Sequence, residues 1–344
     1  MLVLGIDVQI INWTKSFLEN RIFNVKVNTS MSMSTRITSG IPQGTVLGPL
    51  LYNIYAFDIA KYTTNKVVSF ADDTKLYKSI SKHGAARELD ILSLQNDVNG
   101  ISKWAIENKM SINTSKCVHL SIGRSSSTYT LNGTSIANVN QFKDLGVLIS
   151  SDLSSKNHIT AVCQKARQII GMFCKAFAGK LTDGAFCILY KSHIRSLLEY
   201  CPALWSPKYK NEIDELESVQ RFALKLLLPQ KWNQSISMKL ADLNLTTLES
   251  RRYTADLIEC FKFLTSTYDV NIPAQLIMST TSTRGHNRKL FKPRSTSTNV
   301  TNSFFHRVVE PWNSLPADIV ESESVSIFRN RVKNYVNTLP QYLF

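Results

Sequence analysis

The chain has 344 residues, of which 43% are hydrophobic and 19% charged, and its formal net charge at pH 7 is +14. This composition excludes a disordered tail and allows a sizeable core divided over two or three domains. The positive charge favours a polyanionic partner or an anionic membrane surface, and it argues against a neutral helical scaffold.

No run of eighteen apolar residues occurs, so we expect no segment that spans a membrane. The stretch from Met1 to Asp7 lacks a basic region and is too short for a secretory signal. The six cysteines show no C-x-x-C pairing, and several fall on apolar helix faces. We interpret them as reduced core cysteines without disulfides in an intracellular protein, with nucleus and cytoplasm not distinguished.

The first 25 residues predict a helix that starts late and ends near Asn20. Its amphipathic face consists of Ile10, Ile11, Trp13, Phe17 and Leu18. Val25, Val27 and the stretch Arg36–Thr38 then alternate as in the two strands of a hairpin, which leads into a turn at Gly40.

A turn between two glycines comes next, followed by a helix. Gly40 and Gly44 enclose Pro42 and Gln43, and such a backbone can lie close to a flat or charged group. Apolar residues then recur at steps of three and four, as in a helix: Val46, Leu47, Leu50, Leu51, Ile54, Tyr55 and Ile59. Pro49 suits the first turn of this helix, where no N–H is needed.

A second hairpin carries two adjacent carboxylates. The β-branched and aromatic run Val67–Phe70 precedes Asp72 and Asp73, and Leu76 and Tyr77 follow them. The pattern predicts a tight turn that holds both aspartates at the end of two buried strands. Such carboxylates suit Mg²⁺ or Mn²⁺, a hard cation that takes oxygen ligands and leaves room for phosphates. An isolated Asp-Asp pair is more often ordinary turn chemistry, but this pair follows the glycine turn.

Two blocks of this region resemble the reverse transcriptase of non-LTR (LINE-type) retrotransposons of the jockey and CR1-like kind. They are Ser39-Gly40-Ile41-Pro42-Gln43-Gly44-Thr45-Val46-Leu47-Gly48-Pro49-Leu50-Leu51 and Phe70-Ala71-Asp72-Asp73. The resemblance implies an α+β fold: a partial polymerase palm (antiparallel sheet with packed helices), a helical thumb and a mostly helical C-terminal region. It also implies that Gly40, Pro42, Gln43 and Gly44 lie against template and incoming nucleotide, and that Asp72 and Asp73 are catalytic and bind metal.

The resemblance further implies three regions. We expect the partial palm at 1–153, a thumb-like bundle at 154–230, and a basic C-terminal region at 231–344 with a Ser/Thr-rich linker near 279–284. Within the palm, residues 85–110 predict a helix that breaks at Asn99-Gly100 or continues through it. Its expected buried face is Leu89, Leu92, Val98, Ile101, Trp104 and Ala105.

Two further segments of the palm carry expectations. Lys116 stands in a stretch similar to the family's loop whose lysine lies near the nucleotide phosphates, although a lone lysine between strands is more often a solvated edge charge. Residues 142–149 resemble the small hairpin that holds the primer end, and their own pattern predicts only a strand and a turn.

Three apolar stripes predict the helices of the thumb, which by resemblance cradles the primer–template duplex. They include Ile159 to Phe173, Leu189 to Leu198, and Ile213 to Leu227, the last stopped by Pro229. Candidate phosphate contacts are Lys165, Arg167, Lys175 and Lys180, each of which alone is more often a solvated charge.

The C-terminal region combines a helix at 248–264 with a basic tail, which from Thr281 onward holds nine Lys/Arg against four Asp/Glu. The blocks 283–286 and 304–316 are similar to the end of jockey/CR1-like elements. Their aromatics and arginines fit stacking on single-stranded nucleic acid or, equally, a satellite apolar cluster. His286 and His306 have no cysteine nearby, so we predict no zinc site there.

The implied function is RNA-directed DNA polymerase, which uses an RNA template, a DNA primer and dNTPs. Two-metal nucleotidyl transfer needs a carboxylate on a neighbouring strand as well, because adjacent Asp72 and Asp73 point to opposite faces. Asp7 precedes a helix and Asp58 falls on one, so neither suits that strand. We expect the missing strand and the fingers upstream of Met1, and hence an inactive fragment. The alternative is a non-catalytic RNA- or DNA-binding protein derived from the element.

Overall fold

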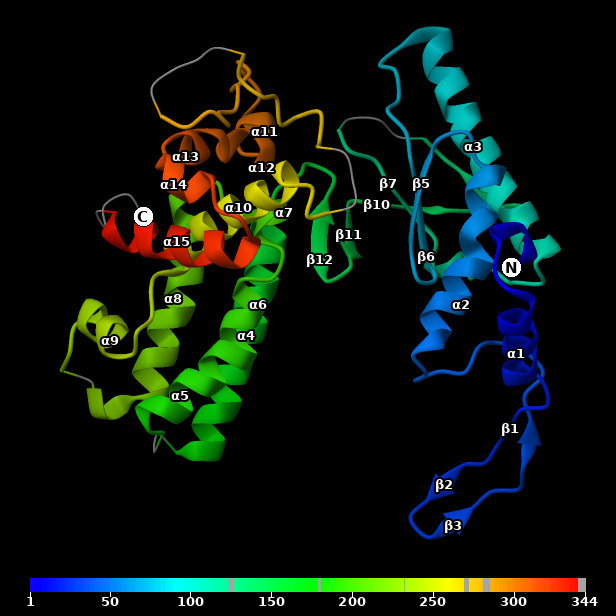
Figure 1. Cartoon of the computed structure of the whole chain (residues 1–344), viewed down its shortest axis with the longest axis horizontal. Coiled ribbons are helices and arrows are strands. Elements are labelled where there is room, and N and C mark those ends of the chain that lie inside the picture. Colours follow the sequence, from blue (N-terminus) through cyan, green and yellow to red (C-terminus); the bar gives the residue numbers. More distant parts are fainter. Residues whose placement is uncertain (124–126, 179–180, 232, 269–271, 281–284, 340–344) are drawn as a thin grey trace. The chain divides into compact units, whose positions relative to one another are not determined.

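The computed structural model describes the chain except residues 124–126, 179–180, 232, 269–271, 281–284 and 340–344. The fold is α+β and contains two compact units (Figure 1). The first unit comprises residues 1–121 and 125–138, and the second comprises 122–124 and 139–344. The regions predicted from the sequence end instead at 153 and 230, and the palm and thumb names for them remain predictions.

The described residues of the first unit form three α-helices and short two-stranded ladders (Figure 1). Its helices are α1 (Val8–Leu18), α2 (Leu47–Ala56) and α3 (Gly84–Glu107), with 3-10 turns at Leu2–Leu4, Phe57–Tyr62 and Thr114–Lys116. Its paired strands are β1 (Ile22–Phe23) with β4 (Thr35–Arg36), β2 (Lys26–Val27) with β3 (Ser30–Met31), β5 (Lys66–Phe70) with β6 (Asp73–Tyr77), β7 (Val118–Leu120) with β10 (Ala137–Val139), and β8 (Thr130–Leu131) with β9 (Thr134–Ser135).

Local chemistry explains why these elements begin where they do. The Asp7 carboxylate accepts a hydrogen bond from the Gln9 N–H at 2.7 Å and so caps α1. Helix α2 has Pro49 in its first turn, as predicted. It passes directly into the 3-10 turn that contains Asp58, whose carboxylate accepts from Trp104 Nε1 at 2.8 Å.

Helix α3 runs unbroken through Asn99 and Gly100, so the possible break there does not occur. A Cβ at Gly100 would lie 2.0 Å from the Tyr62 carbonyl oxygen, so this glycine lets the 3-10 turn approach α3 closely. The small core of this unit forms at that contact, around Ile59, Trp104 and Ala105.

Two predictions about burial in the first unit are wrong. Leu89 and Leu92 of α3 are 66% and 55% exposed, although their spacing placed them on the buried face. Strands β5 and β6 are largely exposed rather than buried. The physical reason is that each described sheet has two strands, and a two-stranded hairpin has no third strand with which to enclose a core.

The second unit is mainly helical (Figure 1). Its one described ladder pairs β11 (Gln141–Asp144) with β12 (Val147–Ser150). The helices are α4 (Lys156–Phe177), α5 (Asp183–Leu189), α6 (Ser196–Leu198), α7 (Pro202–Trp205), α8 (Lys210–Leu227), α9 (Ile236–Asp242), α10 (Leu248–Leu264), α11 (Thr298–Thr301), α12 (Phe304–Arg307), α13 (Val309–Asn313), α14 (Ala317–Val320) and α15 (Val325–Thr338), with a π-helical segment at Tyr190–Arg195 and a 3-10 turn at Pro229–Lys231.

The three predicted apolar stripes meet in one hydrophobic cluster. Helices α4 and α8 lie side by side (Figure 1), and Cys163, Ala166 and Ile170 of α4 are fully buried with Leu216 and Val219 of α8. The cluster extends to the segment from α5 to α6, which also supplies a predicted stripe. The period of the sequence therefore identified these helices and most residues of their inner faces, although Phe222 of the third stripe is 37% exposed.

A second cluster joins α10 and α15 to the C-terminal aromatic block. Phe304, Val308 and Trp312 are buried there, with Phe261 of α10 and Phe328 of α15 stacked 4.2 Å apart between ring centroids. Of the two interpretations of this block, the structure favours the apolar cluster. Residues 283 and 284 of the companion block, together with most of the expected linker, lie outside the described residues.

Basic side chains near the C-terminus make hydrogen bonds and ion pairs within the second unit. Arg307 Nε donates to Asp256 at 2.7 Å, and its Nη2 donates to the other carboxylate oxygen at 3.0 Å. His286 Nε2 lies 3.1 Å from the Trp312 carbonyl oxygen, and His306 Nε2 lies 3.0 Å from the carbonyl oxygen of Pro293. These C-terminal basic side chains therefore hold the fold together.

All six cysteines are free thiols, and Cys163 and Cys260 are fully buried. Cys201 is exposed, so the expectation of uniformly core cysteines is too broad. Among the described residues, none of the helices combines the length and the apolar character that crossing a membrane would need.

Candidate active site

The β5–β6 hairpin places both aspartates at its tip. The register pairs Phe70 with Asp73 and leaves Ala71 and Asp72 as the two loop residues. Ala71 has φ 50°, the positive value that the favoured two-residue hairpin turns require at their first loop position. Asp72 and Asp73 are both exposed. The tight turn is thus confirmed, while the strands that support it are not buried.

The donor set at this tip fits a divalent cation in part. Two exposed carboxylates on adjacent residues offer oxygen ligands, and Mg²⁺ is usually bound by one or two carboxylates plus water or phosphate. Across the described ranges, no group of three or more His, Cys, Asp or Glu side chains converges as a metal site. The hairpin alone therefore suits one loosely held ion rather than a closed metal cage.

Helix α2 lies within electrostatic reach of the tip. Burial raises the pKa of the Tyr52 hydroxyl, and the negative charge of Asp72 raises it further. Because Tyr52 belongs to the helix that follows the glycine turn, the structure brings the two sequence blocks into one neighbourhood.

The glycine turn has the backbone conformation that its sequence predicted. Gly40 and Gly44 have φ of 77° and 74°, a region that side chains with a Cβ rarely adopt. The Arg21 guanidinium donates to the Gly40 carbonyl oxygen and thereby ties the turn to the end of α1. Pro42 is half-buried, and Gln43 is exposed.

Thr45 joins this turn to α2. Its hydroxyl donates to the Pro42 carbonyl oxygen at 2.9 Å and accepts from the Gly48 N–H at 3.1 Å. A Cβ at Gly48 would lie 2.9 Å from that same carbonyl oxygen, so the position needs a glycine for close approach. The turn and the helix start therefore form one rigid unit.

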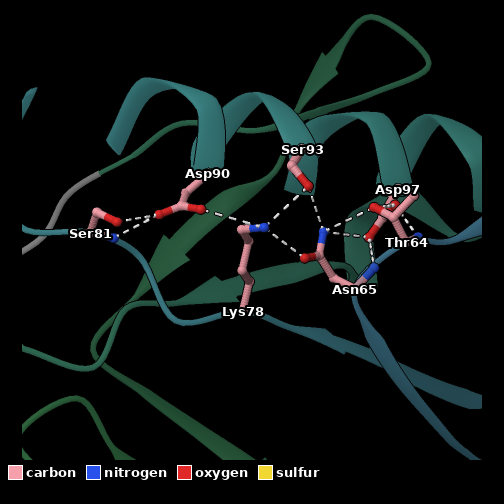
Figure 2. Close-up of polar contacts among 7 residues, drawn as sticks. All are labelled: Thr64, Asn65, Lys78, Ser81, Asp90, Ser93 and Asp97. Atoms are coloured by element: carbon pink, nitrogen blue, oxygen red, sulfur yellow. Dashed lines mark hydrogen bonds and ion pairs between the residues drawn. The ribbon is translucent and has the colours of Figure 1, made fainter. Parts of the chain in front are cut away.

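A polar network holds the base of the hairpin on α3 (Figure 2). The Asp97 carboxylate accepts from the backbone N–H of Thr64 at 2.7 Å and of Asn65 at 2.8 Å. It also accepts from the Thr64 hydroxyl at 3.0 Å and from Asn65 Nδ2 at 2.7 Å. Burial alone would raise the pKa of Asp97, but these hydrogen bonds outweigh it and hold the pKa below its usual value.

The same network reaches the far end of β6. Lys78 Nζ donates to Asn65 Oδ1 at 2.8 Å and forms an ion pair with Asp90 at 3.4 Å (Figure 2). The Asp90 carboxylate accepts from the Ser81 backbone N–H at 2.9 Å and from the Ser81 hydroxyl at 2.7 Å. Hydrogen bonds from Ser81 lower the pKa of Asp90, so the acid stays ionised opposite Lys78.

Lys116 is exposed and ends the 3-10 turn Thr114–Lys116, so it precedes a strand rather than lying within one. Within the part of the chain that the structure describes, no hydrogen bond or ion pair joins Lys116 to the aspartate turn. Its predicted place beside the nucleotide phosphates stays a prediction.

A known protein family matches this region of the chain. A model of the family "Reverse transcriptase (RNA-dependent DNA polymerase)" matches residues 4–149, which include the glycine turn, both aspartates and Lys116. Residues 4–149 belong to the reverse transcriptase family.

Relatives of this reverse transcriptase segment come from mobile elements, which confirms the predicted non-LTR retrotransposon kind. The chain is 28% identical over 231 residues to the RNA-directed DNA polymerase from mobile element jockey of Drosophila melanogaster, covering 63% of this chain and 25% of that protein. It is 27% identical over 246 residues to the probable RNA-directed DNA polymerase from transposon X-element of the same species, covering 68% and 26%. The chain thus spans about a quarter of the length of these relatives.

Sequence reasoning missed the side chains that support the reverse transcriptase hairpin. Asp90, Asp97 and Trp104 follow one another at intervals of seven, which places all three on one face of α3. An acid on the same face as a core tryptophan is the available signal, because a buried carboxylate needs partners. Arg21 offered no comparable signal, since its contact depends on the path of the chain between α1 and Gly40.

Proposed function

We propose that this chain forms the palm and thumb part of an RNA-directed DNA polymerase of a non-LTR retrotransposon. The observation that supports this most directly is the hairpin that presents Asp72 and Asp73 beside the helix that follows the Gly40–Gly44 turn. The partners would be an RNA template, a DNA primer and dNTPs. On this proposal, residues 154–230 are the thumb, and their helices lie along the duplex.

Asp72 and Asp73 would hold a divalent cation, Mg²⁺ or Mn²⁺. When bound, such an ion lowers the pKa of a nucleophilic hydroxyl and offsets negative charge on phosphates. Asp72 lies in the loop and Asp73 opens β6, so the two carboxylates leave the backbone in different directions. A further carboxylate from outside this hairpin would therefore complete a two-ion site, and we expect no primer extension by the chain alone.

The glycine turn would bind substrate through its backbone. Positive φ at Gly40 and Gly44 exposes peptide groups without a covering Cβ, which allows a flat base or a phosphate to approach. Arg21 and Thr45 would keep this surface rigid, because each hydrogen-bonds a carbonyl oxygen of the turn. Gln43 is exposed at its centre and would contact template or nucleotide.

Metal binding tests the proposal. Asp72→Asn removes one of two anionic ligands, so we expect the Kd for Mn²⁺, measured by electron paramagnetic resonance, to rise at least tenfold. Glu88→Gln is the matched control, because it removes one exposed carboxylate from α3 and should leave the Kd unchanged. Equal Mn²⁺ binding by wild type and Asp72→Asn contradicts the assignment of Asp72.

A second experiment tests primer extension by the chain. The purified chain is incubated with a primer annealed to an RNA template, Mg²⁺ and the four dNTPs. We expect no extended primer. Extension that disappears in Asp72→Asn would show that a carboxylate within this chain completes the site.

A further inference from the structure

The hairpin that carries Asp72 is held by polar contacts at its base rather than by a core. Both strands are largely exposed, and an isolated two-stranded hairpin is marginally stable in water. Its fixed points on α3 are the contacts of Asp97, Ser93 and Asp90, which succeed one another at steps of three and four on one helix face (Figure 2). The position of the tip therefore depends on these contacts.

We infer that Asp97 and Lys78 are positioning residues for Asp72: they fix the angle at which the hairpin leaves α3 and thus the place of the aspartate turn beside α2. This inference rests on the proposed function, in which Asp72 binds the metal. It assigns a role to two side chains that lie at the opposite end of the hairpin from the turn.

Separate contacts hold the two ends of the hairpin base on α3, and Asn65 links them. We call the contacts of Asp97, Asn65, Lys78 and Asp90 the clamp. Asp97 takes the backbone N–H groups of Thr64 and Asn65, immediately before β5 begins at Lys66. Lys78 stands directly after β6 ends at Tyr77, and its ammonium group bridges Asn65 Oδ1 and Asp90. Because Asn65 also donates to Asp97, one continuous set of contacts joins both strands to α3 (Figure 2).

A small change of angle at the base of the hairpin displaces the aspartate turn, because the turn lies a whole strand length away. Five residues of strand rise by roughly 17 Å, so a tilt of about 5° at the base displaces the tip by about 1.5 Å. A displacement of about 1 Å is enough to cost about a hundredfold in a reaction that depends on positioning. Asp97 is only 2% exposed and accepts four hydrogen bonds, so loss of its charge cannot be compensated by water.

Hydrogen exchange measures the clamp directly. In Asp97→Asn the amide group retains the size of the carboxylate but presents N–H donors to the N–H groups of Thr64 and Asn65. We expect the amides of residues 64–78 to exchange at least tenfold faster, while the amides of α3 and α4 keep their protection. Glu88→Gln, on an exposed position of the same helix, should leave every rate within twofold of wild type.

The position of the tip has its own readout. Mn²⁺ bound at Asp72 should broaden the ring signal of Tyr52, because the charge of Asp72 already acts on that hydroxyl. We expect Asp97→Asn to weaken this broadening at saturating Mn²⁺, and Asp72→Asn to abolish it without changing exchange at 64–78. A purely structural role for Asp97 would instead lower the protection of α3 and the hairpin together.

The outcomes separate this inference from the proposed function. Absence of Mn²⁺ broadening in wild type overturns the proposed metal-binding role of Asp72, whereas exchange at 64–78 still decides the role of the contacts at the hairpin base. Exchange rates in Asp97→Asn that match those in Glu88→Gln overturn the inference. Should Asp97→Asn unfold the whole first unit, Lys78→Met decides, because it removes the bridging ammonium group and leaves the Asp97 contacts in place.

Discussion

His158 is a buried residue whose ring supports the β11–β12 hairpin. The Leu148 N–H donates to His158 Nδ1 at 3.2 Å, and the residue is 3% exposed. Its ring packs against Trp205 with centroids 4.9 Å apart. Because Nδ1 accepts a hydrogen bond, the proton lies on Nε2, which has no partner among the described residues. Burial, and then the charge of Lys143, lower the pKa of His158, so the folded protein holds it neutral.

The lowered pKa of His158 predicts a loss of stability in mild acid. The unfolded chain binds a proton at this histidine below about pH 6.5, whereas the folded chain binds it only at a lower pH, so the free energy of unfolding falls as the pH falls through that value. His158→Asn keeps an acceptor near Leu148 without a titrating ring. We expect its free energy of unfolding, measured by urea titration, to drop less than that of wild type between pH 7.5 and 5.5, by at most about 1.4 kcal/mol per pH unit.

The comparison of the two proteins isolates His158 from other titrating groups. Glu217 is a half-buried acid and Asp256 a buried one; burial raises the pKa of both, so they act in the opposite direction as the pH falls. Both remain in His158→Asn, and their effect cancels in the difference. Equal drops in the free energy of unfolding for wild type and variant would exclude a titrating role for His158.

At the scale of one element, the β11–β12 turn carries avoidable strain. Asp144 pairs with Val147, and the two loop residues Leu145 and Gly146 have φ of 43° and 92°. Two positive φ values match the turn that favours Asn-Gly, yet leucine occupies the first position. The Tyr200 hydroxyl donates to the Leu145 carbonyl oxygen at 3.0 Å, and its ring lies against Gly146, which holds the turn in this conformation.

Leu145→Asn should therefore stabilise the second unit. Asparagine tolerates the left-handed region, where most residues cost about 1 kcal/mol or more, so we expect a gain of up to about 1 kcal/mol in the free energy of unfolding from urea titration. The Leu145 backbone carbonyl that accepts from Tyr200 is retained. Leu145→Ala is the control, because it shortens the side chain and keeps a Cβ with the same strain. A gain of similar size in the alanine variant would exclude the backbone explanation.

At the scale of the whole molecule, the net charge of +14 resides largely on lysines that the fold leaves exposed. Arg167 forms an ion pair with Glu215 at 3.8 Å, and the half-buried Arg307 pairs with the buried Asp256. Lys165 and Lys175 of α4, by contrast, are exposed. Of the candidate phosphate contacts, these two remain candidates, Arg167 bridges α4 to α8, and Lys180 lies outside the described residues.

Nucleic-acid binding should depend on Lys165 and Lys175. We expect the chain to bind an RNA–DNA duplex with an affinity that falls as salt rises, because neutralised phosphates release counterions. Lys165→Ala/Lys175→Ala should reduce the log–log salt slope by about 1 to 2, as measured by fluorescence anisotropy. Lys15→Ala/Lys103→Ala removes the same charge from exposed positions on α1 and α3 and is the matched control. Equal slopes for the two variants would show that only net charge matters.

The sequence by itself determined most elements and the family. The helix at 248–264 has the predicted bounds, and the hairpin at 66–77 turns where predicted. Helical periodicity and turn chemistry are local properties of a chain, so they can be recognised without any partner. The two motif blocks at 39–51 and 70–73 could also be recognised from the sequence, because their glycines and aspartates depend on backbone conformation and position within a short segment.

Only the tertiary structure decided what covers each face. Periodicity assigned Leu89 and Leu92 to the buried face, but both side chains are exposed. The aromatic block at 304–316 fitted two roles in the sequence, and packing against Phe261 and Phe328 placed it in a core. Asp97 gained its role from Thr64 and Asn65, more than thirty residues away. A side chain's periodicity fixes its direction, whereas its burial and partners depend on chain segments that meet only on folding.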